Sequence, residues 1–581
     1  MLGRTDSRRR VLFLLGVFVF ASLALVARLA YWQVIDRERL ASQALAQTTV
    51  TIDTPSKRGD IFDRTGTVVL ATTVQRERLV AAPAQLTPEL RKATVAELTR
   101  ILRLDDAAAI ALRDTLSGSA KYVILRHGLD RLVADQIRAA MAARTVSGLS
   151  LEPEPERVYP QVGGGPGSSL AAHLLGFVNR EGGGQYGVEQ AYQSTLAGQP
   201  RVLVADRDPS GQAMLDAATV TETGEPGADL TLTIDAGLQL KVEQELLAAW
   251  VADKAKRASA VVMDPYTGEI YAEATYPSYD GNDYKAIAAT DPSRFLDPVV
   301  SSVYEPGSVF KMMTAAAALT KATVTPTSKI KDVGTLRLDK GRTKIDDADR
   351  KGMGWMTFED GIAYSRNVVA AKVALGLGTT TRESSAILYD MWLRLGYGKA
   401  TGIDVAGEVA GLVRDPGLKA WRQIDLANGA FGQGVAVTPI QLAMAYASLV
   451  NGGTLVQPHV VSSIGERDVV AAPRGQGVID PSLSPTMIHL MQHVITEVPF
   501  YRNRTLVPGY DVGGKTGTAQ IWDPKANKGR GAWKKNLFNY SFIGWIAREK
   551  GHPDLVVAIQ IEEGTPTVVK VGRLEMPVMS F

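Results

Sequence analysis

The chain has 581 residues and a formal net charge of +3, from 64 Lys and Arg against 61 Asp and Glu. This length predicts two or three domains, and the balanced charge gives no reason to expect a nucleic acid as the partner. The sequence contains no cysteine, which excludes disulfide bonds, thiol catalysis and cysteine metal sites.

An apolar run begins close to the N-terminus. Seventeen uncharged residues, 11–27, follow a basic cluster, and the run continues past Arg28 to Trp32. Such a run approaches the length of about 20 residues that crosses a bilayer, and a long arginine side chain near its end can reach the interface. We therefore predict a transmembrane anchor over residues 11–32, preceded by a tail of residues 1–10.

The basic residues on the N-terminal side of this anchor predict that the tail is cytoplasmic. Everything after the anchor then lies on the outer side of the cell membrane, and the protein is single-pass. A cleaved signal peptide is the alternative. The length of the run argues against cleavage, and so does its small-x-small triplet, residues 22–24, which lies inside the run and not after it.

Residues 33–227 mix several kinds of element. Two short extended pieces flank a turn at residues 63–66, and a glycine-rich loop occupies residues 163–167. The helical patterns lie at residues 35–46, 87–104 and 130–143. Reactive side chains are not concentrated in this part of the sequence, so we predict a non-catalytic module.

A Gly-Glu-Pro-Gly segment at residues 224–227 indicates a linker, and the pattern changes after it. The elements predicted beyond it are a strand at 229–234, a helix at 236–255, a hairpin of 259–263 with 269–274, and late strands at 540–547 and 555–562. Strands at both ends with helices between them favour an antiparallel sheet packed against helices. We therefore predict an α+β domain over residues 228–581.

The most informative stretch of this domain begins at Pro306 and Gly307, which break the preceding chain. A helix should start near Ser308, and it is apolar almost all round, so Lys311 occupies a place where a charge is unfavourable. The spacing puts Ser308 and Lys311 on one face. Desolvation and the helix N-terminus both lower a lysine pKa, so Lys311 could accept the Ser308 proton and make the serine a nucleophile.

This spacing does not decide the matter by itself. Ser308 could be a helix N-cap, and Lys311 could extend to the surface. The same Ser-x-x-Lys pattern recurs from Ser328 to Lys331 in a polar stretch, and an isolated match has a high false-positive rate.

Two further motifs follow in the same domain. Ser365-Arg366-Asn367 precedes a helical run at residues 368–375, and Lys515-Thr516-Gly517-Thr518 follows two glycines ahead of the late strands. Together with Ser308 and Lys311, and in this order, they form the motif set of penicillin-binding proteins and class A β-lactamases.

Two histidines, His489 and His493, have the spacing that puts both rings on one helical face. The residues between them offer no carboxylate, so we interpret them as an ordinary helix face. We predict chemistry without a metal or a cofactor.

With these motifs, the chain resembles the class B penicillin-binding proteins, which are monofunctional peptidoglycan D,D-transpeptidases. The resemblance covers nearly the whole chain and implies that residues 33–227 are a dimerisation-type pedestal ahead of a transpeptidase domain. Further segments that look like the family's are residues 58–64, 157–160, 172–176, 187–189, 431–434 and 438–441.

The resemblance implies catalytic roles for three residues. Ser308 would attack the carbonyl between the two D-alanines of a stem peptide and form an acyl-enzyme, with Lys311 as the base. Ser365 would help to relay the proton to the leaving amine. An amine from a neighbouring stem peptide would then take the acyl group.

The remaining motif residues would bind substrate. Asn367 would hydrogen-bond the substrate amide, and Lys515 with the hydroxyls of Thr516 and Thr518 would bind the terminal carboxylate. Gly517 would let the substrate backbone approach the strand edge. Backbone N–H groups of the nucleophile and of Thr518 would form the oxyanion hole.

The partners that the resemblance implies are peptidoglycan stem peptides, β-lactams as covalent inhibitors, and a SEDS-family glycosyltransferase with other membrane proteins of cell-wall synthesis or division. The wording of residues 304–308 and 513–520 looks like the division-specific enzymes, whereas elongation-specific enzymes more often have proline where Glu305 stands. We expect septal synthesis, with elongation as the alternative.

Two other functions are possible. A D,D-carboxypeptidase or β-lactamase would use the same motifs, with water reaching the acyl-enzyme in place of an amine. A β-lactam sensor would need a signalling domain, for which the predicted tail of residues 1–10 leaves little room.

The sequence departs from the family pattern at three places. Arg366 stands where a small residue is commoner, so its side chain must point away from the cleft if substrate is to fit. Thr65 stands where asparagine is frequent, and the segment around residues 163–169 is longer than expected.

Overall fold

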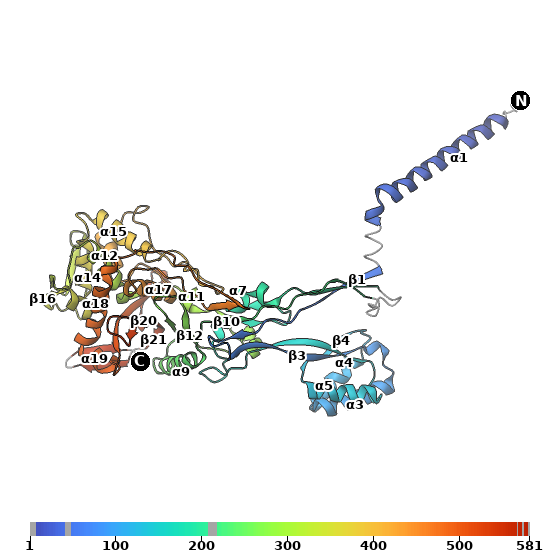
Figure 1. Cartoon of the computed structure of the whole chain (residues 1–581), viewed down its shortest axis with the longest axis horizontal. Helices are drawn as coiled ribbons and strands as arrows, with labels where there is room; N and C mark the ends of the chain where they lie inside the picture. The colour runs from blue at the N-terminus through green and yellow to red at the C-terminus, as the bar shows by residue number, and fades with distance from the viewer. Residues whose placement is uncertain (1–6, 41–47, 207–217, 566, 572–573, 579–581) are drawn as a thin grey trace. The chain divides into compact units, whose positions relative to one another are not determined.

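The computed structural model describes residues 7–40, 48–206, 218–565, 567–571 and 574–578. The chain forms two compact units (Figure 1). One contains Met1–Lys57 with Ala197–Gly227, and the other contains Arg58–Leu196 with Ala228–Phe581.

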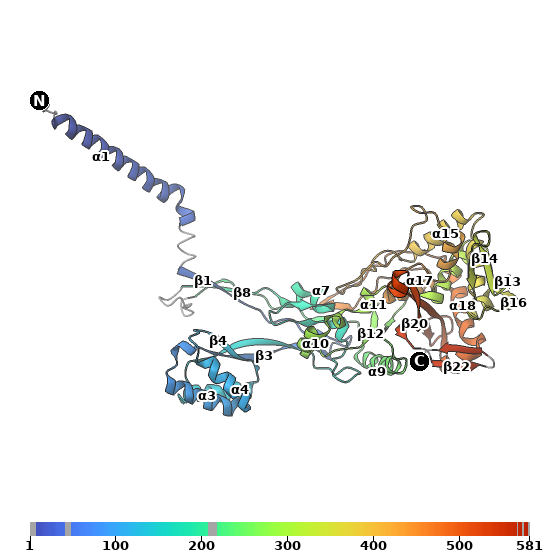
Figure 2. The same cartoon turned by 180° about the vertical axis from the view of Figure 1, so that it is seen from behind.

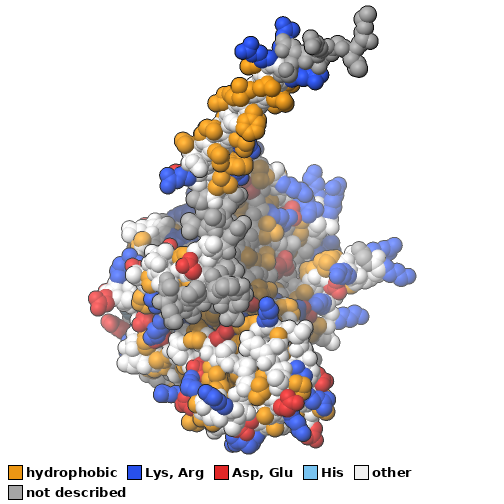
Figure 3. All heavy atoms as spheres, turned by 90° about the vertical axis from the view of Figure 1, so that its right-hand side faces the viewer, with side chains coloured by type: hydrophobic (Ala, Val, Ile, Leu, Met, Phe, Trp, Pro, Cys, Tyr) orange, Lys and Arg blue, Asp and Glu red, His pale blue; other side chains and the backbone are white. Residues whose placement is uncertain are grey.

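The first unit carries the apolar N-terminal segment as helix α1 (Ser7–Ala30), which a π-helical turn, η1 (Tyr31–Ile35), extends. Figure 3 shows hydrophobic side chains along this helix and Lys and Arg side chains beside its N-terminal end. The helix from Arg8 to Ile35 is long and apolar enough to cross a membrane, and it contains the predicted anchor. It is the one such helix among the described residues.

A three-stranded antiparallel sheet completes the first unit, in the order β1-β8-β9. Its strands are β1 (Thr49–Thr54), β8 (Arg201–Asp206) and β9 (Thr219–Glu222). Of the helix predicted over residues 35–46, residues 37–40 are helical, and residues 41–46 lie outside the described part of the chain.

The second unit is built on a five-stranded antiparallel sheet, which confirms the predicted α+β fold. In spatial order its strands are β12 (Ile270–Tyr276), β11 (Arg257–Met263), β21 (Leu555–Gly564), β20 (Ala532–Ala547) and β19 (Asp511–Asp523). The predicted hairpin is β11–β12, and β20 begins well before residue 540. Strand β19 lies at the sheet edge and carries the Lys515 motif.

Helices cover both faces of this sheet because side chains alternate along each strand. From β11, Ala258 and Ala260 join the small core beside α9 (Ala236–Ala252), while Val261 and Met263 join the main core. The main core contains α17 (Pro439–Val450) and α12 (Lys311–Thr320), and α12 is buried along nearly its whole length.

Other helices contribute to this core. They are α10 (Tyr284–Thr290), α11 (Pro298–Ser301), α13 (Phe358–Ala363), α14 (Asn367–Leu375), α15 (Thr381–Arg394), α16 (Gln423–Gly429), α18 (Ser484–Glu497) and α19 (Pro499–Thr505). Among them, α14, α15 and α18 contact α12. Two short strand pairs lie beside α14: β13 (Lys329–Asp332) with β16 (Gly354–Thr357), and β14 (Thr335–Leu338) with β15 (Thr343–Asp346).

A second, mixed sheet of the same unit joins residues from before and after the predicted linker. Its order is β18-β17-β10-β2-β3-β4, with β5 also paired to β3. Its strands are β18 (Arg467–Asp468), β17 (Val461–Ile464), β10 (Leu230–Leu232), β2 (Ile61–Phe62), β3 (Val69–Ala81), β4 (Val123–Leu129) and β5 (Leu149–Val158). Strand β10 pairs with β2, from before residue 227, and with β17, from after it. The sheet therefore crosses the predicted domain boundary at residue 227, which stays a prediction.

Three helices lie together at one end of the long strand β3 (Figure 1, Figure 2). They are α3 (Pro88–Leu102), α4 (Asp106–Leu116) and α5 (Arg131–Ala142). Helices α3 and α5 confirm two predicted helices, whereas α4 was not predicted. Leu98, Leu116 and Ile137 bury one face of each helix in a separate core.

The glycine-rich loop packs directly on helix α9. A Cβ atom at Gly164 would lie 2.6 Å from the Cβ of Glu243, so a larger residue would force the loop off the helix. The Glu243 carboxylate accepts hydrogen bonds from the N–H groups of Gly164 and Ala171, at 2.7 Å each. The extra length at residues 163–169 therefore links this loop to a helix of the sheet core.

Three segments matched by resemblance, around Arg58, Arg157 and Glu189, converge on one buried cluster. The Arg58 Nε lies 2.8 Å from Glu189 Oε2, and the Arg157 Nε lies 2.7 Å from Glu189 Oε1. The Glu189 side chain is fully buried. A carboxylate held by two guanidiniums forms a strong, directional junction, and we call these three residues the arginine–glutamate cluster.

Candidate active site

The turn that carries Ser308, the expected nucleophile, connects an irregular segment to the central helix, and we call residues 306–310 the nucleophile turn. Gly307–Phe310 form a 3-10 turn, η6, and the α-helix begins only at Lys311, slightly later than predicted. Gly307 has a φ of 64°, and a Cβ atom there would lie 3.2 Å from the Thr518 oxygen. The turn therefore needs glycine both for its backbone conformation and for its contact with β19.

Two buried side chains hold this turn. The Tyr446 hydroxyl donates to the Val309 carbonyl at 2.7 Å, and the Ser541 hydroxyl donates to the Pro306 carbonyl at 3.0 Å. Because α17 and β20 supply these donors, Ser308 is held on a rigid support.

Lys311 is completely buried and lies at the centre of the site. Its Nζ is 3.0 Å from Ser308 Oγ, 2.8 Å from Asn367 Oδ1 and 3.1 Å from Ser365 Oγ. It also contacts the Ser365 carbonyl at 2.5 Å. The lysine therefore does not reach the surface, and Ser308 is not a side-chain N-cap.

Ser365 and Asn367 come from the junction between α13 and α14. Ser365 has a φ of 55°, in the left-handed region that non-glycine residues seldom adopt. This conformation ends α13 through a hydrogen bond from Ser365 N to the Ile362 carbonyl and lets α14 start at Asn367. Both side chains then face Lys311.

Strand β19 brings Lys515 to the same place. The Lys515 Nζ lies 3.0 Å from Ser365 Oγ and 2.9 Å from the Thr516 carbonyl. Ser365 Oγ is therefore within hydrogen-bond distance of both lysine nitrogens, so it is positioned to pass a proton between groups.

Burial of two lysines side by side changes their titration. Burial, followed by the positive charge of Lys515, lowers the pKa of Lys311 well below its usual value. Burial also lowers the pKa of Lys515 to about 7. A neutral Lys311 amine can accept the Ser308 proton, whereas an ordinary lysine with a pKa near 10.4 could not do so at neutral pH.

The other residues of the Lys515 motif lie along the edge strand. Thr518 is exposed, and the Thr516 hydroxyl shares a 2.8 Å hydrogen bond with the Tyr501 hydroxyl. A Cβ atom at Gly517 would lie 2.6 Å from the Pro306 oxygen and from Ser541 Oγ. Gly517 thus lets β19 lie directly against the nucleophile turn, a constraint different from the expected approach of substrate.

Sequence reasoning missed two residues that support these groups. Tyr501, on α19, orients the Thr516 hydroxyl, and the pattern around it contained no signal for this contact. The sequence analysis used Glu305 only to compare division-specific with elongation-specific enzymes and gave it no structural role. In the structure, its Oε1 accepts a hydrogen bond from Gly434 N at 2.8 Å. This bond connects the nucleophile turn to the segment at residues 431–434.

The second Ser-x-x-Lys pattern has a different structure. Ser328 Oγ accepts a hydrogen bond from Thr325 N at 2.8 Å within a turn, and Lys331 is exposed on β13. A serine and a lysine in a turn and a strand are not aligned on a buried helical face, so this pair is not a nucleophile and base.

His489 and His493 face carboxylates that the sequence did not predict, because they come from α13. His489 Nε2 lies 3.1 Å from Glu359 Oε2, and His493 Nε2 lies 3.0 Å from Asp360 Oδ1. Within the described part of the chain, no group of three or more histidine, aspartate or glutamate side chains is placed to hold a metal ion.

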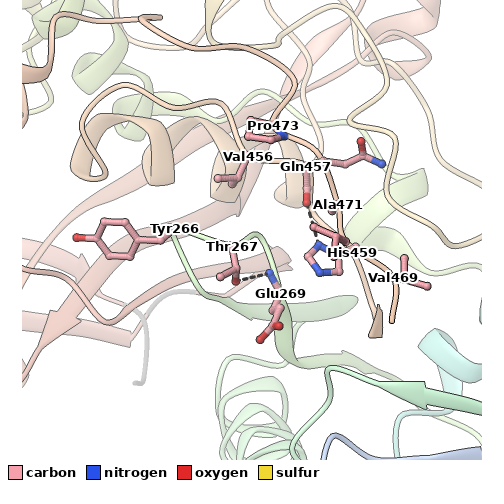
Figure 4. A pocket seen from close by; sticks show the side chains of 10 residues that line it. Tyr266, Thr267, Glu269, Val456, Gln457, His459, Val469, Ala471 and Pro473 are labelled. Atoms are coloured by element: carbon pink, nitrogen blue, oxygen red, sulfur yellow. Dashed lines mark hydrogen bonds between the residues drawn. The ribbon is translucent and has the colours of Figure 1, made fainter. Parts of the chain in front are cut away.

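A separate cavity of about 240 Å³ lies beside the β11–β12 turn (Figure 4). Tyr266, Thr267 and Glu269 line it from the turn, and Gln457 and His459 line it from the opposite segment. The residues of the three motifs do not line this cavity.

Comparison with known proteins identifies both halves of the chain. Residues 258–573 match the penicillin-binding protein transpeptidase domain, and residues 53–232 match the penicillin-binding protein dimerisation domain. The first match covers more than half of the chain and contains the three motifs.

Individual relatives match over almost the whole length. The chain is 30% identical to a probable peptidoglycan D,D-transpeptidase, PbpC, of Pseudomonas aeruginosa, over 99% of this chain and 94% of that protein. It is 29% identical to the stage V sporulation protein D of Bacillus subtilis, over 98% and 84%. Among solved structures, penicillin-binding protein 2X of Streptococcus thermophilus has the same fold, with a TM-score of 0.71 and 22% identity over 89% of this chain and 77% of that one. The chain therefore belongs to the penicillin-binding proteins that carry a dimerisation domain ahead of a transpeptidase domain.

Proposed function

We propose that this protein is a peptidoglycan D,D-transpeptidase that cross-links stem peptides through a serine acyl-enzyme, with Ser308 as nucleophile and Lys311 as its base. The observation that carries the proposal is the 3.0 Å contact between Ser308 Oγ and the fully buried Lys311 Nζ. Family membership supplies the reaction class.

In the acylation step, Lys311 takes the Ser308 proton while Oγ attacks the carbonyl between the two D-alanines. The N–H groups of Ser308 and Thr518 stabilise the oxyanion. Ser365 relays the proton to the leaving D-alanine amine, which is consistent with its contacts to both Lys311 and Lys515. The amine of a second stem peptide then attacks the ester, and Ser308 recovers its proton.

The donor peptide binds along the edge strand β19. Its terminal carboxylate is held by the Lys515 charge and by the Thr516 and Thr518 hydroxyls. Asn367 hydrogen-bonds the substrate amide. Among the described residues β19 is an edge strand, so beside Gly517 it can offer backbone groups to an extended peptide.

A β-lactam acylates the same serine, and this gives the direct test. Intact-protein mass after incubation with a labelled penicillin should rise by one adduct in the wild type and not in Ser308→Ala. Label on Ser365 or Ser328 in a peptide digest would overturn the assignment of the nucleophile.

Transfer to an amine is distinguished from hydrolysis by its products. With a stem-peptide substrate and an amine acceptor, the wild type should form the cross-linked product. Release of the free acid at an unchanged rate with and without the acceptor would instead assign a carboxypeptidase. A sensor would stay acylated and form neither product.

The N-terminal helix anchors the protein in the cell membrane, with residues 1–10 in the cytoplasm, residues 11–32 crossing the membrane and the chain from residue 33 outside. The chain has no cysteine, so single-cysteine variants report topology cleanly. In intact spheroplasts a membrane-impermeant maleimide should label Ser117→Cys and not Ser7→Cys. The opposite labelling pattern would reverse the orientation.

We assign residues 33–227 to a pedestal and residues 228–581 to the transpeptidase domain, since all three motifs lie after residue 227. Removal of the first 40 residues should leave soluble protein that still reacts with penicillin, because only the anchor is lost. A folded but unreactive product would mean that the anchor segment shapes the site.

The protein acts in cell division, with a SEDS-family glycosyltransferase that makes the strands it cross-links. The support is the resemblance of residues 304–308 and 513–520 to the division-specific enzymes. A fluorescent fusion should gather at midcell, and depletion should give filaments. Signal along the side wall, with rounded cells on depletion, would assign the protein to elongation.

A further inference from the structure

The side chain of Arg366, between Ser365 and Asn367, points away from Lys311 and is only 8% exposed. It enters a group of three aspartates, Asp332, Asp347 and Asp349, which we call the aspartate cluster. Arg366 Nε lies 2.9 Å from Asp332 Oδ2, and Arg366 Nη2 lies 3.0 Å from Asp349 Oδ1 and 3.4 Å from Asp347 Oδ2. Arg366 also donates to the carbonyl of Lys351.

The aspartate cluster is itself rigidly held. Asp332 Oδ1 accepts from Gly334 N at 3.0 Å, and Asp332 Oδ2 accepts from Met353 N at 2.9 Å. Asp332 ends β13, which pairs with β16 directly after Met353. Both carboxylate oxygens of Asp332 thus accept a backbone N–H, and Oδ2 also accepts the Arg366 guanidinium.

Arg366 also occupies the N-cap position of α14, where a side-chain acceptor is favoured. Arginine has no acceptor. Asp347 replaces it, because its Oδ1 accepts a hydrogen bond from Val368 N at 3.1 Å. The neighbouring Asp346 carbonyl accepts from Asn367 Nδ2 at 3.1 Å, which orients the Asn367 side chain so that Oδ1 faces Lys311.

The turn that this network surrounds is unfavourable on its own. Ser365 is a non-glycine residue in the left-handed region, and such residues persist where neighbouring contacts hold them. The side chain of the next residue, Arg366, contacts the three aspartates and the Lys351 carbonyl. Its backbone N–H donates to the Gly361 carbonyl at 2.9 Å.

We propose that Arg366 is a positioning residue for acylation: through the aspartate cluster it holds the left-handed turn that presents Ser365 Oγ and Asn367 Oδ1 to Lys311. The inference rests on the proposed function, because its readout is acylation of Ser308. If the wild type fails to acylate at Ser308, the proposed function fails. A defect confined to the variants tests Arg366 alone.

The first test substitutes Arg366 by lysine, which keeps the charge and loses the planar fork, and by glutamine, which loses both. Stopped-flow acylation with a fluorescent penicillin separates non-covalent affinity from the acylation rate constant. We expect the rate constant to fall by about 10- to 100-fold in both variants, because small misplacements of reacting groups have effects of this size. Affinity should change by less than about three-fold.

The matched control is Arg350, which lies in the loop after β15 with Asp347 and Asp349. Its side chain is exposed and contacts Asp346 Oδ2 at 3.5 Å. Arg350→Gln should acylate like the wild type. An unchanged rate constant in both Arg366 variants would overturn the proposal, and so would an equal loss in affinity and rate, which a general loosening of the domain would produce.

A pH profile separates position from charge. The charged groups that act on Lys311 are Lys515 from β19, Asp347 from the loop after β15, and Arg366. Since the Arg366 charge lowers the pKa of Lys311, Arg366→Gln should move the rising limb of acylation to higher pH, whereas Arg366→Lys should not. If the rising limb lies at the same pH in the wild type, Arg366→Gln and Arg366→Lys, the Arg366 charge does not influence the pKa of Lys311.

A second pair of variants, at Asp347, tests the proposal even if the Arg366 variants do not fold. Asp347→Asn keeps the acceptor for Val368 N, and Asp347→Leu removes it at similar volume. We expect a smaller loss for asparagine, which keeps the acceptor, than for leucine, which should lose about 10-fold or more, both corrected for the fraction of protein that acylates at long times. Equal rates in the two variants would contradict the proposal.

Discussion

Two buried charged groups in the second unit are alike in burial and differ in their partners. In the arginine–glutamate cluster, Arg58 and Arg157 share the carboxylate of Glu189. At the active site, Lys311 and Lys515 lie near one another, and within the described residues their hydrogen bonds run to hydroxyl, amide and backbone oxygens and not to a carboxylate.

This difference in partners explains why one buried cluster can only be structural, whereas the other can take part in proton transfer. A guanidinium stays protonated in proteins, and an opposite charge stabilises it further, so the arginine–glutamate cluster can only hold segments together. A lysine buried without a counter-charge loses its proton more easily and becomes a base. Burial alone therefore does not mark a catalytic charge. Lys311 differs because a serine hydroxyl, and not a carboxylate, lies within hydrogen-bond distance of its buried amine.

The largest expected effect is on Lys311. Lys311→Arg keeps the charge and removes the base, so the acylation rate should fall by about 10²- to 10⁴-fold, the range for loss of a general base. Labelled penicillin measures it. The matched control is Lys321→Arg, at the exposed end of the same helix, which should acylate normally. Near wild-type acylation by Lys311→Arg would contradict the role of Lys311 as a base, because the positive charge alone would then be enough.

The arginine–glutamate cluster should respond in stability and not in chemistry. Glu189→Gln leaves two buried guanidiniums facing a neutral amide, which should lower the free energy of unfolding by about 3–5 kcal/mol. Denaturant unfolding measures this change, and the folded fraction should acylate at the wild-type rate.

The control for this variant is Glu156→Gln, which breaks a half-exposed pair with Arg76 and should cost about 0–1 kcal/mol. A slower acylation rate in folded Glu189→Gln would show that the two clusters are coupled.

The pH dependence of acylation should report the two lysines directly. In the proposed mechanism Lys311 must be neutral to act, so the ratio of acylation rate constant to dissociation constant should rise as Lys311 deprotonates, far below the usual lysine range. The same mechanism requires a charged Lys515 to bind the carboxylate. Because its pKa is about 7, the ratio should fall as pH rises through about 7.

Lys515→Arg tests this assignment, since arginine keeps its charge. The falling limb should disappear in this variant while the rising limb stays. A falling limb that survives the substitution would belong to another group.

The smallest effect is expected at Tyr501. Tyr501→Phe removes the hydrogen bond to the Thr516 hydroxyl, so penicillin affinity should weaken by about 0.5–1.5 kcal/mol, roughly 2- to 12-fold. Titration of the acylation rate against penicillin concentration measures this. Tyr510→Phe, at an exposed position, is the control. No change in affinity would mean that Thr516 needs no support from α19.

The sequence by itself determined the local elements around the site. Pro306 and Gly307 set the break before the central helix, the apolar pattern placed Lys311 on a buried helix, and the hairpin and helix α9 followed from their periodicity. These features depend on neighbours close in the chain, so they can be read without the tertiary structure. The order of the three motifs also carried the family resemblance, which implied serine acyl-enzyme chemistry.

Only the tertiary structure decided which groups meet. Lys311 contacts residues 54 and 56 positions away, and Lys515 reaches Ser365 across 150 positions. The contact of Gly517 with the nucleophile turn, the support from Tyr501 and the pairing of β10 with β2 likewise depend on packing between distant segments. The lowered lysine pKa values belong here too, because desolvation and the distance to other charges exist only once the core has formed around them.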